Sequence, residues 1–145
     1  MLERADFYLL AQTDLQARWR LLTTLLSRQW PQGHQFHLHC DSAEEAQTLD
    51  TLLWQQEPSS FLPHHRLDQD FSGHSPITLG YGDYWPTPQP GCILVNLAAD
   101  IPPQLSHFQR VLEIVVQGEP WLSRQREHYR HYRSLGLTPQ LHRLG

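Results

Sequence analysis

The stretch Cys92-Ile93-Leu94-Val95-Asn96-Leu97 gives the clearest indication of the fold. This short apolar run follows a proline-rich segment and is typical of a β-strand that is buried on both faces. Asp6-Phe7-Tyr8-Leu9-Leu10 near the start of the chain and the range Val111–Val116 have the same character. Strands buried on both faces occur in parallel sheets, so these runs predict a sheet covered by helices on both sides.

Helical periodicity follows the first of these strands. Thr13, with Gln16 three residues later, predicts a capping box that begins a helix extending to about Gln29. Apolar residues at helical spacing form one stripe along it: Leu15, Trp19, Leu22, Leu26 and Trp30. Pro31 and Gly33 then end the helix.

A second strand and a second helix follow. Residues 35–40 alternate, with Phe36, Leu38 and Cys40 on one face of the predicted strand and Gln35, His37 and His39 on the other. Ser42 and Glu45 predict another capping box. The helix that it begins has Ala46, Leu49 and Leu53 on its core stripe.

The second half of the chain is less regular. The ranges 57–75 and 80–91 are rich in proline and glycine and lack a sustained period, and a short strand, Ile77–Leu79, separates them. A short helix is predicted from Pro102 to about Phe108. The last helix is predicted over Glu119–Leu135, with Pro120 at its first position and Gly136 after its end.

This order of elements predicts a single domain, residues 1–145, with a three-layer α/β/α fold. The sheet is expected to be mostly parallel, to have four to five strands, and to resemble nucleotide-binding Rossmann folds. The turn Ala11–Asp14 contains no glycine, and neither G-x-G-x-x-G nor G-x-x-x-x-G-K-[ST] occurs. The chain also contains no lysine. The sequence therefore predicts no phosphate-binding loop and no cofactor.

Composition restricts the compartment and the partners. The 145 residues carry a formal net charge of −4, and no basic-then-apolar signal opens the chain. No apolar run is long enough to cross a bilayer. Cys40 and Cys92 lie in predicted buried strands, which favours small core hydrophobes in a reducing compartment. We therefore expect a cytoplasmic protein with no membrane association.

Catalytic and metal sites have little support in the sequence. His34, His37, His39 and Cys40 are close together, but the strand period places Cys40 on the opposite face from His37 and His39. An acid or base could come from the loop histidines, and a carboxylate pair from the loop aspartates: His64, His65, His74, Asp68 and Asp70. No serine or cysteine nucleophile motif accompanies them. No catalytic residue and no metal ligand is assigned.

The last predicted helix carries the clearest binding feature. At about 100° per residue, Arg126, Arg130 and Arg133 fall on one stripe, and Tyr129 lies beside it. A local cationic face on an acidic protein favours a defined anionic partner. The alternative is that this is simply a solvated helix face.

A second feature is aromatic. Trp54 lies about 80° off the Ala46-Leu49-Leu53 stripe by the helical period, so its helix does not obviously bury it. Phe61 follows in the irregular loop. Aromatic residues at the edge of such a loop often line interaction pockets. Alternatively, Trp54 and Phe61 close the core under their own loop.

These segments together resemble the chi subunit family of bacterial DNA polymerase III. The resemblance extends over nearly the whole chain and rests on three blocks, of which the second and third are specific. The blocks are residues 6–10 (Asp-Phe-Tyr-Leu-Leu), Leu49-Asp50-Thr51-Leu52-Leu53-Trp54 with the following Ser60-Phe61-Leu62-Pro63-His64, and residues 126–136 (Arg-Glu-His-Tyr-Arg-His-Tyr-Arg-Ser-Leu-Gly).

The resemblance implies a non-catalytic accessory subunit of the clamp loader in DNA replication. Such a subunit would bind the psi subunit and the acidic C-terminal tail of single-stranded DNA-binding protein, and would contact DNA only indirectly. The tail ends in a phenylalanine with a free carboxylate, so the resemblance implies an apolar floor (Trp54, Phe61) beside Arg126, Tyr129, Arg130 and Arg133. Leu122 stands where the family can carry a lysine, so affinity should depend more on Arg126 and Arg130.

Two other functions remain as alternatives. The first is an α/β enzyme acting on a nucleotide or phosphoester with His64, His65 or His74 as acid or base, which the glycine-free first turn disfavours. The second is direct binding of single-stranded DNA, which the negative net charge disfavours. No segment of the chain can be assigned to psi from the resemblance.

Overall fold

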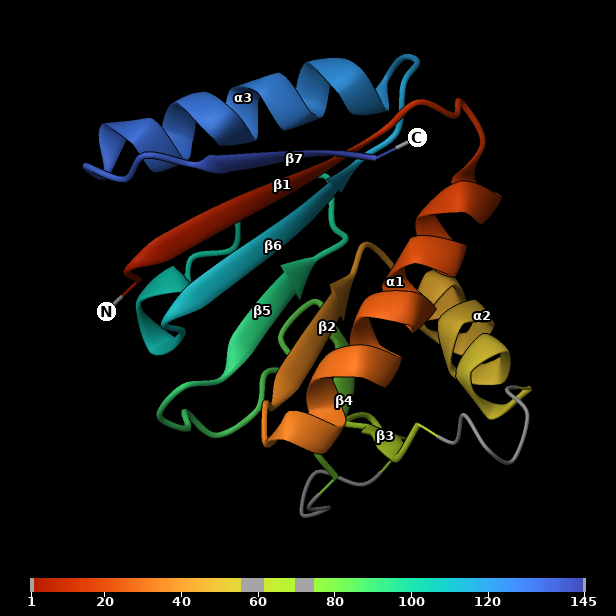
Figure 1. The fold of residues 1–145 in the computed structure, drawn as a ribbon. Helices are drawn as coiled ribbons and strands as arrows, with labels where there is room; N and C mark the ends of the chain where they lie inside the picture. Colours follow the sequence, from red (N-terminus) through yellow and green to blue (C-terminus); the bar gives the residue numbers. More distant parts are fainter. Residues whose placement is uncertain (1, 56–61, 70–74, 145) are drawn as a thin grey trace.

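The computed structural model describes residues 2–55, 62–69 and 75–144. Its centre is a sheet of seven parallel strands in the order β3-β4-β2-β5-β6-β1-β7 (Figure 1). The strands are β1 Arg4–Leu10, β2 Phe36–Cys40, β3 His64–Arg66, β4 Ile77–Tyr81, β5 Ile93–Asn96, β6 Arg110–Val115 and β7 Gln140–Leu144. The α/β class and the parallel sheet are confirmed, but the sheet is larger than the four to five strands predicted.

Three α-helices in the described part of the chain cover the sheet: α1 Leu15–Gln29, α2 Ala43–Trp54 and α3 Trp121–Ser134. Ser42 caps α2 as predicted, since its hydroxyl accepts a hydrogen bond from the Glu45 amide. The cap of α1 was predicted one residue early. Asp14, not Thr13, accepts the Ala17 amide at 2.8 Å, where a carboxylate also faces the positive end of the helix dipole.

The handedness of the connections explains which helix covers which face. The chain passes from β1 to β2 and from β2 to β3 in one direction along the sheet, and from β6 to β7 in the other. Right-handed crossovers that run in opposite directions must lie on opposite faces. Accordingly, α1 and α2 lie together on one face and α3 lies on the other (Figure 1).

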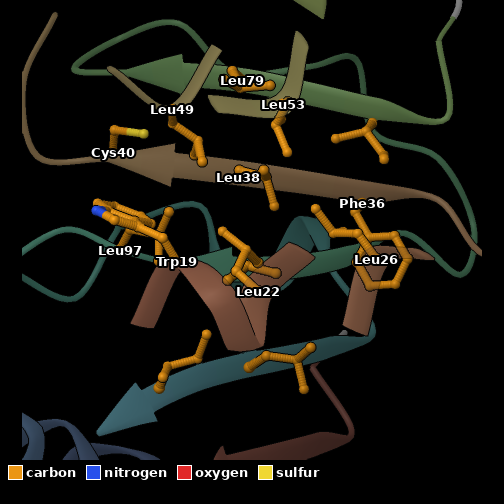
Figure 2. Packing of buried hydrophobic residues seen from close by; sticks show 14 of the residues in the cluster. Trp19, Leu22, Leu26, Phe36, Leu38, Cys40, Leu49, Leu53, Leu79 and Leu97 are labelled. Carbon is orange, nitrogen blue, oxygen red and sulfur yellow. The ribbon is translucent and has the colours of Figure 1, made fainter. Parts of the chain in front are cut away.

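The centre of the core between the sheet and the two helices α1 and α2 is an apolar cluster (Figure 2). Leu22 and Leu26 from α1 and Leu49 and Leu53 from α2 are each at most 1% exposed. They pack against side chains of one face of β2, namely Phe36, Leu38 and Cys40. Burial of such side chains contributes roughly 1.5–3 kcal/mol each, so the predicted helical stripes account for this half of the core.

The core on the α3 face mixes apolar and polar groups. Phe7, Leu94, Val111, Val115 and Tyr132 form its apolar part. Four buried polar residues of the strands share this face with them: His37, His39, Asn96 and Glu113. The proline-rich connection between β4 and β5 also covers it, because Trp85 stacks on His39 with 3.6 Å between ring centroids.

The two edge strands were not predicted. His64–Arg66 (β3) pairs with β4, and Gln140–Leu144 (β7) pairs with β1. Near the β7 edge, Asp6 of β1 is fully buried. Side-chain nitrogens of Arg4, Arg110 and His142 lie 2.7–2.9 Å from its carboxylate oxygens. Another prediction was too long: the helix expected from Pro102 to about Phe108 is a single 3-10 turn, η3 Leu105–His107. A proline disfavours helical backbone angles in the residue before it, so Pro103 keeps Pro102 out of a helix.

Candidate partner-binding site

Helix α3 presents the predicted arginine stripe to solvent. Arg126, Arg130 and Arg133 are all exposed. The opposite side of the helix is buried and comprises Gln125, His128 and Tyr132. The stripe is therefore a cationic face on a helix whose rotation about its axis is fixed by buried residues.

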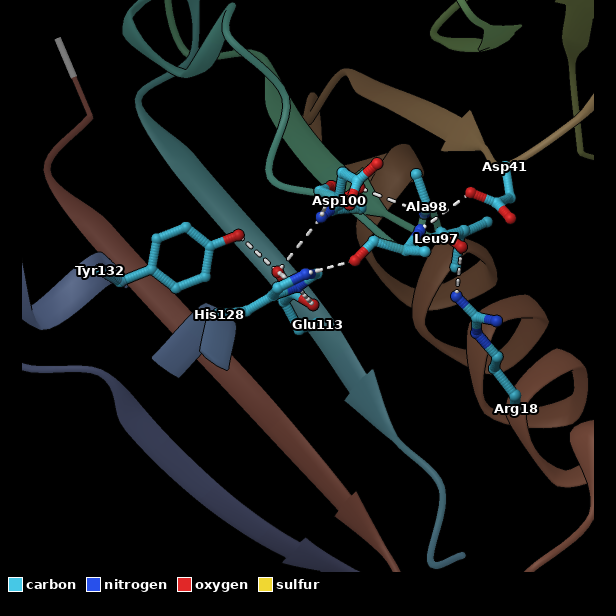
Figure 3. Close-up of polar contacts among 10 residues, drawn as sticks. Arg18, Asp41, Leu97, Ala98, Asp100, Glu113, His128 and Tyr132 are labelled. Carbon is cyan, nitrogen blue, oxygen red and sulfur yellow. Dashed lines mark hydrogen bonds and ion pairs between the residues drawn. The ribbon is translucent and has the colours of Figure 1, made fainter. Parts of the chain in front are cut away.

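A buried carboxylate fixes that rotation. Glu113, at the centre of β6, is 1% exposed. His128 Nδ1 lies 2.9 Å from both of its oxygens, and the Tyr132 hydroxyl donates to Oε2. Asn96 Nδ2 donates to the same oxygen at 3.3 Å. Because His128 and Tyr132 are one helical turn apart, this carboxylate binds two consecutive turns of α3 (Figure 3).

The contacts of His128 require a charged ring. Its Nε2 lies 2.7 Å from the carbonyl oxygen of Ala99, so both ring nitrogens face acceptors. Only the imidazolium form donates from both nitrogens. Burial alone would lower the pKa of His128, but the hydrogen bond and the charge of Glu113 outweigh it and raise the pKa above its ordinary value. This pair was not predicted, although a single glutamate within the apolar run Val111–Val116 is the signal that could have indicated it.

Apolar side chains border the arginine stripe on one side. Leu122 and Tyr129 are half-buried against the α3-face core. Tyr129 packs edge-on against Phe7, with ring centroids 5.6 Å apart. By the helical period, both lie between the buried face of α3 and the stripe. A ligand on α3 could therefore contact cations and an apolar surface together.

The other side of α3 adjoins a separate apolar cavity of about 450 Å³. It lies between the second half of α3 and the connection that precedes η3. Its lining comprises Leu2, Ile101, Pro102, Pro103, Leu105, Ser106, His131 and Leu135. None of the three stripe arginines lines it.

The structure does not bring Trp54 next to the arginines. Trp54 ends α2 and is 57% exposed, which confirms that the helix does not bury it. Its ring lies 4.6 Å from that of His64 on the edge strand β3. Since α2 and α3 cover opposite faces (Figure 1), Trp54 and the arginine stripe are on two separate surfaces. Phe61 lies outside the described residues.

The histidines of β2 are buried and hydrogen-bonded. His37 Nδ1 donates to Thr78 Oγ1 at 2.8 Å, since that hydroxyl in turn donates to the Phe36 carbonyl. His37 Nε2 can then accept from His39 Nδ1 at 3.1 Å. Burial lowers the pKa of both rings, to about 4 for His39. As predicted, Cys40 faces the opposite side. Among the described residues, no group of three or more His, Cys, Asp or Glu side chains could hold a metal ion.

The loop residues considered for catalysis form other contacts or lie outside the described residues. His64 is buried, with Nδ1 2.6 Å from the Leu62 carbonyl and Nε2 3.1 Å from Asp50. Asp68 forms an ion pair with Arg66 at 2.7 Å. Asp70 and His74 lie outside the described residues.

No helix in the described ranges is long and apolar enough to cross a bilayer.

Fold and sequence together define an α/β protein whose first strand-to-helix turn lacks the glycines of a phosphate loop. The model of the family described as DNA polymerase III chi subunit, HolC, matches residues 2–140, and the chain belongs to this family. It is 33% identical to the DNA polymerase III subunit chi of Pseudomonas aeruginosa, over 97% of this chain and 96% of that protein. The subunits chi of Haemophilus influenzae and Escherichia coli are 24% and 25% identical, over 94% or more of each chain.

Membership in the family establishes the general role. The chain is a chi subunit, a non-catalytic member of the DNA polymerase III complex in DNA replication. The similarity to the three relatives extends over nearly the full length of each. The recognition made from the three sequence blocks is therefore confirmed.

Proposed function

We propose that this chi subunit binds the acidic C-terminal tail of single-stranded DNA-binding protein along α3, and the psi subunit through another surface. It would thereby link the clamp loader to protein-coated single-stranded DNA. The observation that carries the proposal is the exposed stripe Arg126-Arg130-Arg133 on a helix whose opposite side is fixed by Glu113. A guanidinium can hold a carboxylate through two parallel hydrogen bonds, which suits a terminal carboxylate.

The terminal phenylalanine of the tail needs an apolar contact next to the arginines. Leu122 and Tyr129 provide one, because both are half-buried and border the stripe. We assign the ring to this side of α3 and the carboxylate to Arg126, which is one helical turn from each of them. The aspartates that precede the phenylalanine would then face Arg130 and Arg133.

Trp54 would belong to a different contact surface. It is exposed at the end of α2, beside the edge strand β3 and on the opposite face from α3. A tail of a few residues bound at Arg126 would not reach it. We assign Trp54 to the surface that binds psi, and Phe61 follows it closely in the chain. Two separate surfaces allow one small subunit to hold both partners at once.

A peptide titration tests the tail assignment. A peptide with the acidic tail and a free terminal carboxylate should bind, and the same peptide with an amidated C-terminus should bind more weakly by about 1.5–3 kcal/mol. Isothermal titration of the full chain with both peptides measures the difference. Equal affinity for acid and amide would show that the carboxylate is not recognised.

A pair of variants tests where the ring binds. Tyr129→Ala should lower the affinity for the acid peptide, whereas Leu135→Ala should leave it unchanged. Leu135 is an exposed apolar residue on the other side of α3, where it lines the separate cavity. Far-UV circular dichroism of both variants controls for loss of the helix. A selective effect of Leu135→Ala would place the ring in that cavity instead.

A further inference from the structure

His128 attaches α3 to two other parts of the fold. Its Nδ1 lies 2.9 Å from both oxygens of Glu113 on β6 (Figure 3). Its Nε2 lies 2.7 Å from the carbonyl oxygen of Ala99, in the connection that follows β5. The residue is 3% exposed. Because His128 is only two residues after Arg126, these contacts hold the part of α3 to which we assigned the terminal carboxylate of the tail.

The Ala99 carbonyl is part of a connection that is itself held in place. The Ala99 amide donates to Asp41 Oδ1 at 3.0 Å, and the Ala98 amide donates to Asn96 Oδ1 at 3.2 Å. Asn96 Nδ2 in turn donates to Glu113 Oε2 at 3.3 Å. The connection and the carboxylate of Glu113 are therefore linked by hydrogen bonds, so the Ala99 carbonyl does not move independently of the sheet.

Loss of the ring proton would turn one contact of His128 into a repulsion. The neutral ring keeps the hydrogen bond from Nδ1 to Glu113, because a carboxylate only accepts. Nε2 then has a lone pair and faces the Ala99 carbonyl, so two acceptors oppose each other. The buried carboxylate also loses the positive charge that contacts it, which leaves negative charge beneath the arginine stripe. Both changes act against the binding of an anionic ligand to α3.

The groups around His128 favour its protonated form. Burial lowers the pKa of His128, but the hydrogen bond and charge of Glu113 and the charge of Asp100 outweigh it, so the pKa is raised from 6.5. Tyr132, the other α3 side chain on Glu113, has its pKa raised well above the ordinary value by burial and by Glu113, so it stays neutral. From α1, the charge of Arg18 also acts on Glu113. As the pH rises above 6.5, we expect His128 to be the member of this cluster that loses its proton.

We propose that His128 is a positioning residue through which pH regulates tail binding: its protonated ring holds α3 in the binding arrangement, and its deprotonation weakens the binding of the acidic tail. This inference rests on the proposed function of α3. His128 does not touch the tail, because it lies on the buried side of the helix, opposite the arginine stripe. Linkage then requires that tail binding stabilises the protonated ring, so binding takes up protons.

Isothermal titration of the full chain with the acid tail peptide, from about pH 6 to about pH 9, tests the proposal. The affinity should fall about fivefold to tenfold as His128 loses its proton. Within the transition, the heat of binding should depend on the ionisation enthalpy of the buffer, because protons are taken up. Peptide binding with the same affinity at every pH overturns this inference and leaves the proposed function intact. Absence of binding at every pH overturns both.

Three variants separate His128 from other groups that titrate. His128→Arg keeps a positive charge and several N–H donors that do not titrate in this range, so it should bind the peptide with the same affinity at every pH. His128→Gln is neutral and should bind weakly at every pH. His131→Gln is the matched control, since His131 is an exposed histidine of the same helix that lines the separate cavity, and it should keep the wild-type pH dependence. A pH dependence that disappears in His131→Gln, or persists in His128→Arg, overturns the proposal.

NMR of the wild-type protein tests the same link without any substitution. The reporters are the His128 ring and the Asp100 amide, whose peptide bond contains the Ala99 carbonyl. Both signals should titrate with one midpoint above about pH 6.5, and saturating acid peptide should move this midpoint to higher pH. A midpoint that does not move with bound peptide, or a ring that titrates without the Asp100 amide, overturns the proposal.

Discussion

The two faces of the sheet are held by different interactions. The α1/α2 face is an apolar layer in which helical stripes meet one side of β2. The α3 face depends on a buried carboxylate, Glu113, which binds His128 and Tyr132. The hydrophobic effect is non-directional, whereas hydrogen bonds have preferred distances and angles. The face that presents the arginine stripe is thus the one whose helix is oriented by directional contacts.

The largest expected effect comes from removing that carboxylate. Glu113→Leu leaves His128, Tyr132 and Asn96 without their common partner and should lower the free energy of unfolding by about 3–5 kcal/mol. Urea unfolding measures the loss. Adding His128→Leu and Tyr132→Phe should restore part of the stability, because fewer buried polar groups then lack partners. A cost no greater than that of a surface substitution would contradict the role of Glu113.

A truncation on the opposite face should be comparably destabilising but different in its effect on function. Leu49→Ala removes a fully buried side chain between α2 and the sheet and should cost about 2–5 kcal/mol. The affinity for the tail peptide should remain at the wild-type value under conditions where the variant is folded, because α3 is on the other face. Loss of tail affinity in the folded variant would show that the two faces are coupled.

The polar face should also make stability depend on pH. Burial lowers the pKa of His37 and His39, so the unfolded chain takes up protons first. The two neutral rings contribute fully to the free energy of unfolding above about pH 6.5, the pKa of a histidine in the unfolded chain. This contribution is lost as the pH falls toward about 4, the pKa of His39 in the folded protein. In this window, the free energy of unfolding falls by about 1.4 kcal/mol per pH unit for each extra proton that the unfolded chain binds.

Two single substitutions separate this effect from general acid unfolding. His39→Gln should flatten the dependence in this window, whereas substitution of the exposed His107 by glutamine should leave it unchanged. Unfolding by urea at several pH values gives both slopes. His128 has the opposite sign: its raised pKa stabilises the fold at low pH, and that contribution disappears as the pH rises through the folded value. Identical slopes in wild type and His39→Gln would refute the assignment.

Local patterns predicted one face well and the other only in part. The apolar stripes of α1 and α2 and the alternation of Phe36, Leu38 and Cys40 were sufficient for the α1/α2 core. The strands β3 and β7 were missed because His64–Arg66 and Gln140–Leu144 are largely polar and become strands only by pairing with β4 and β1. Edge strands have one neighbour and one open side, so their sequences need not be apolar.

The binding residues show the same limit. The exposure of Trp54 and of Arg126, Arg130 and Arg133 followed from helical periodicity. Their separation on two surfaces did not, since it depends on the strand order: opposite directions of travel along the sheet place α2 and α3 on opposite faces. That order rests in part on β7, which the sequence did not reveal.

The most direct test of the separation of the two surfaces compares Arg126→Ala with Trp54→Ala in titrations with the acid tail peptide at two salt concentrations. Arg126→Ala should weaken binding about tenfold at low salt and less at high salt, because screening acts on charged contacts. Trp54→Ala should bind the peptide like the wild type and should lose affinity for psi instead. Weaker tail binding in Trp54→Ala, with Arg126→Ala unaffected, would contradict the account.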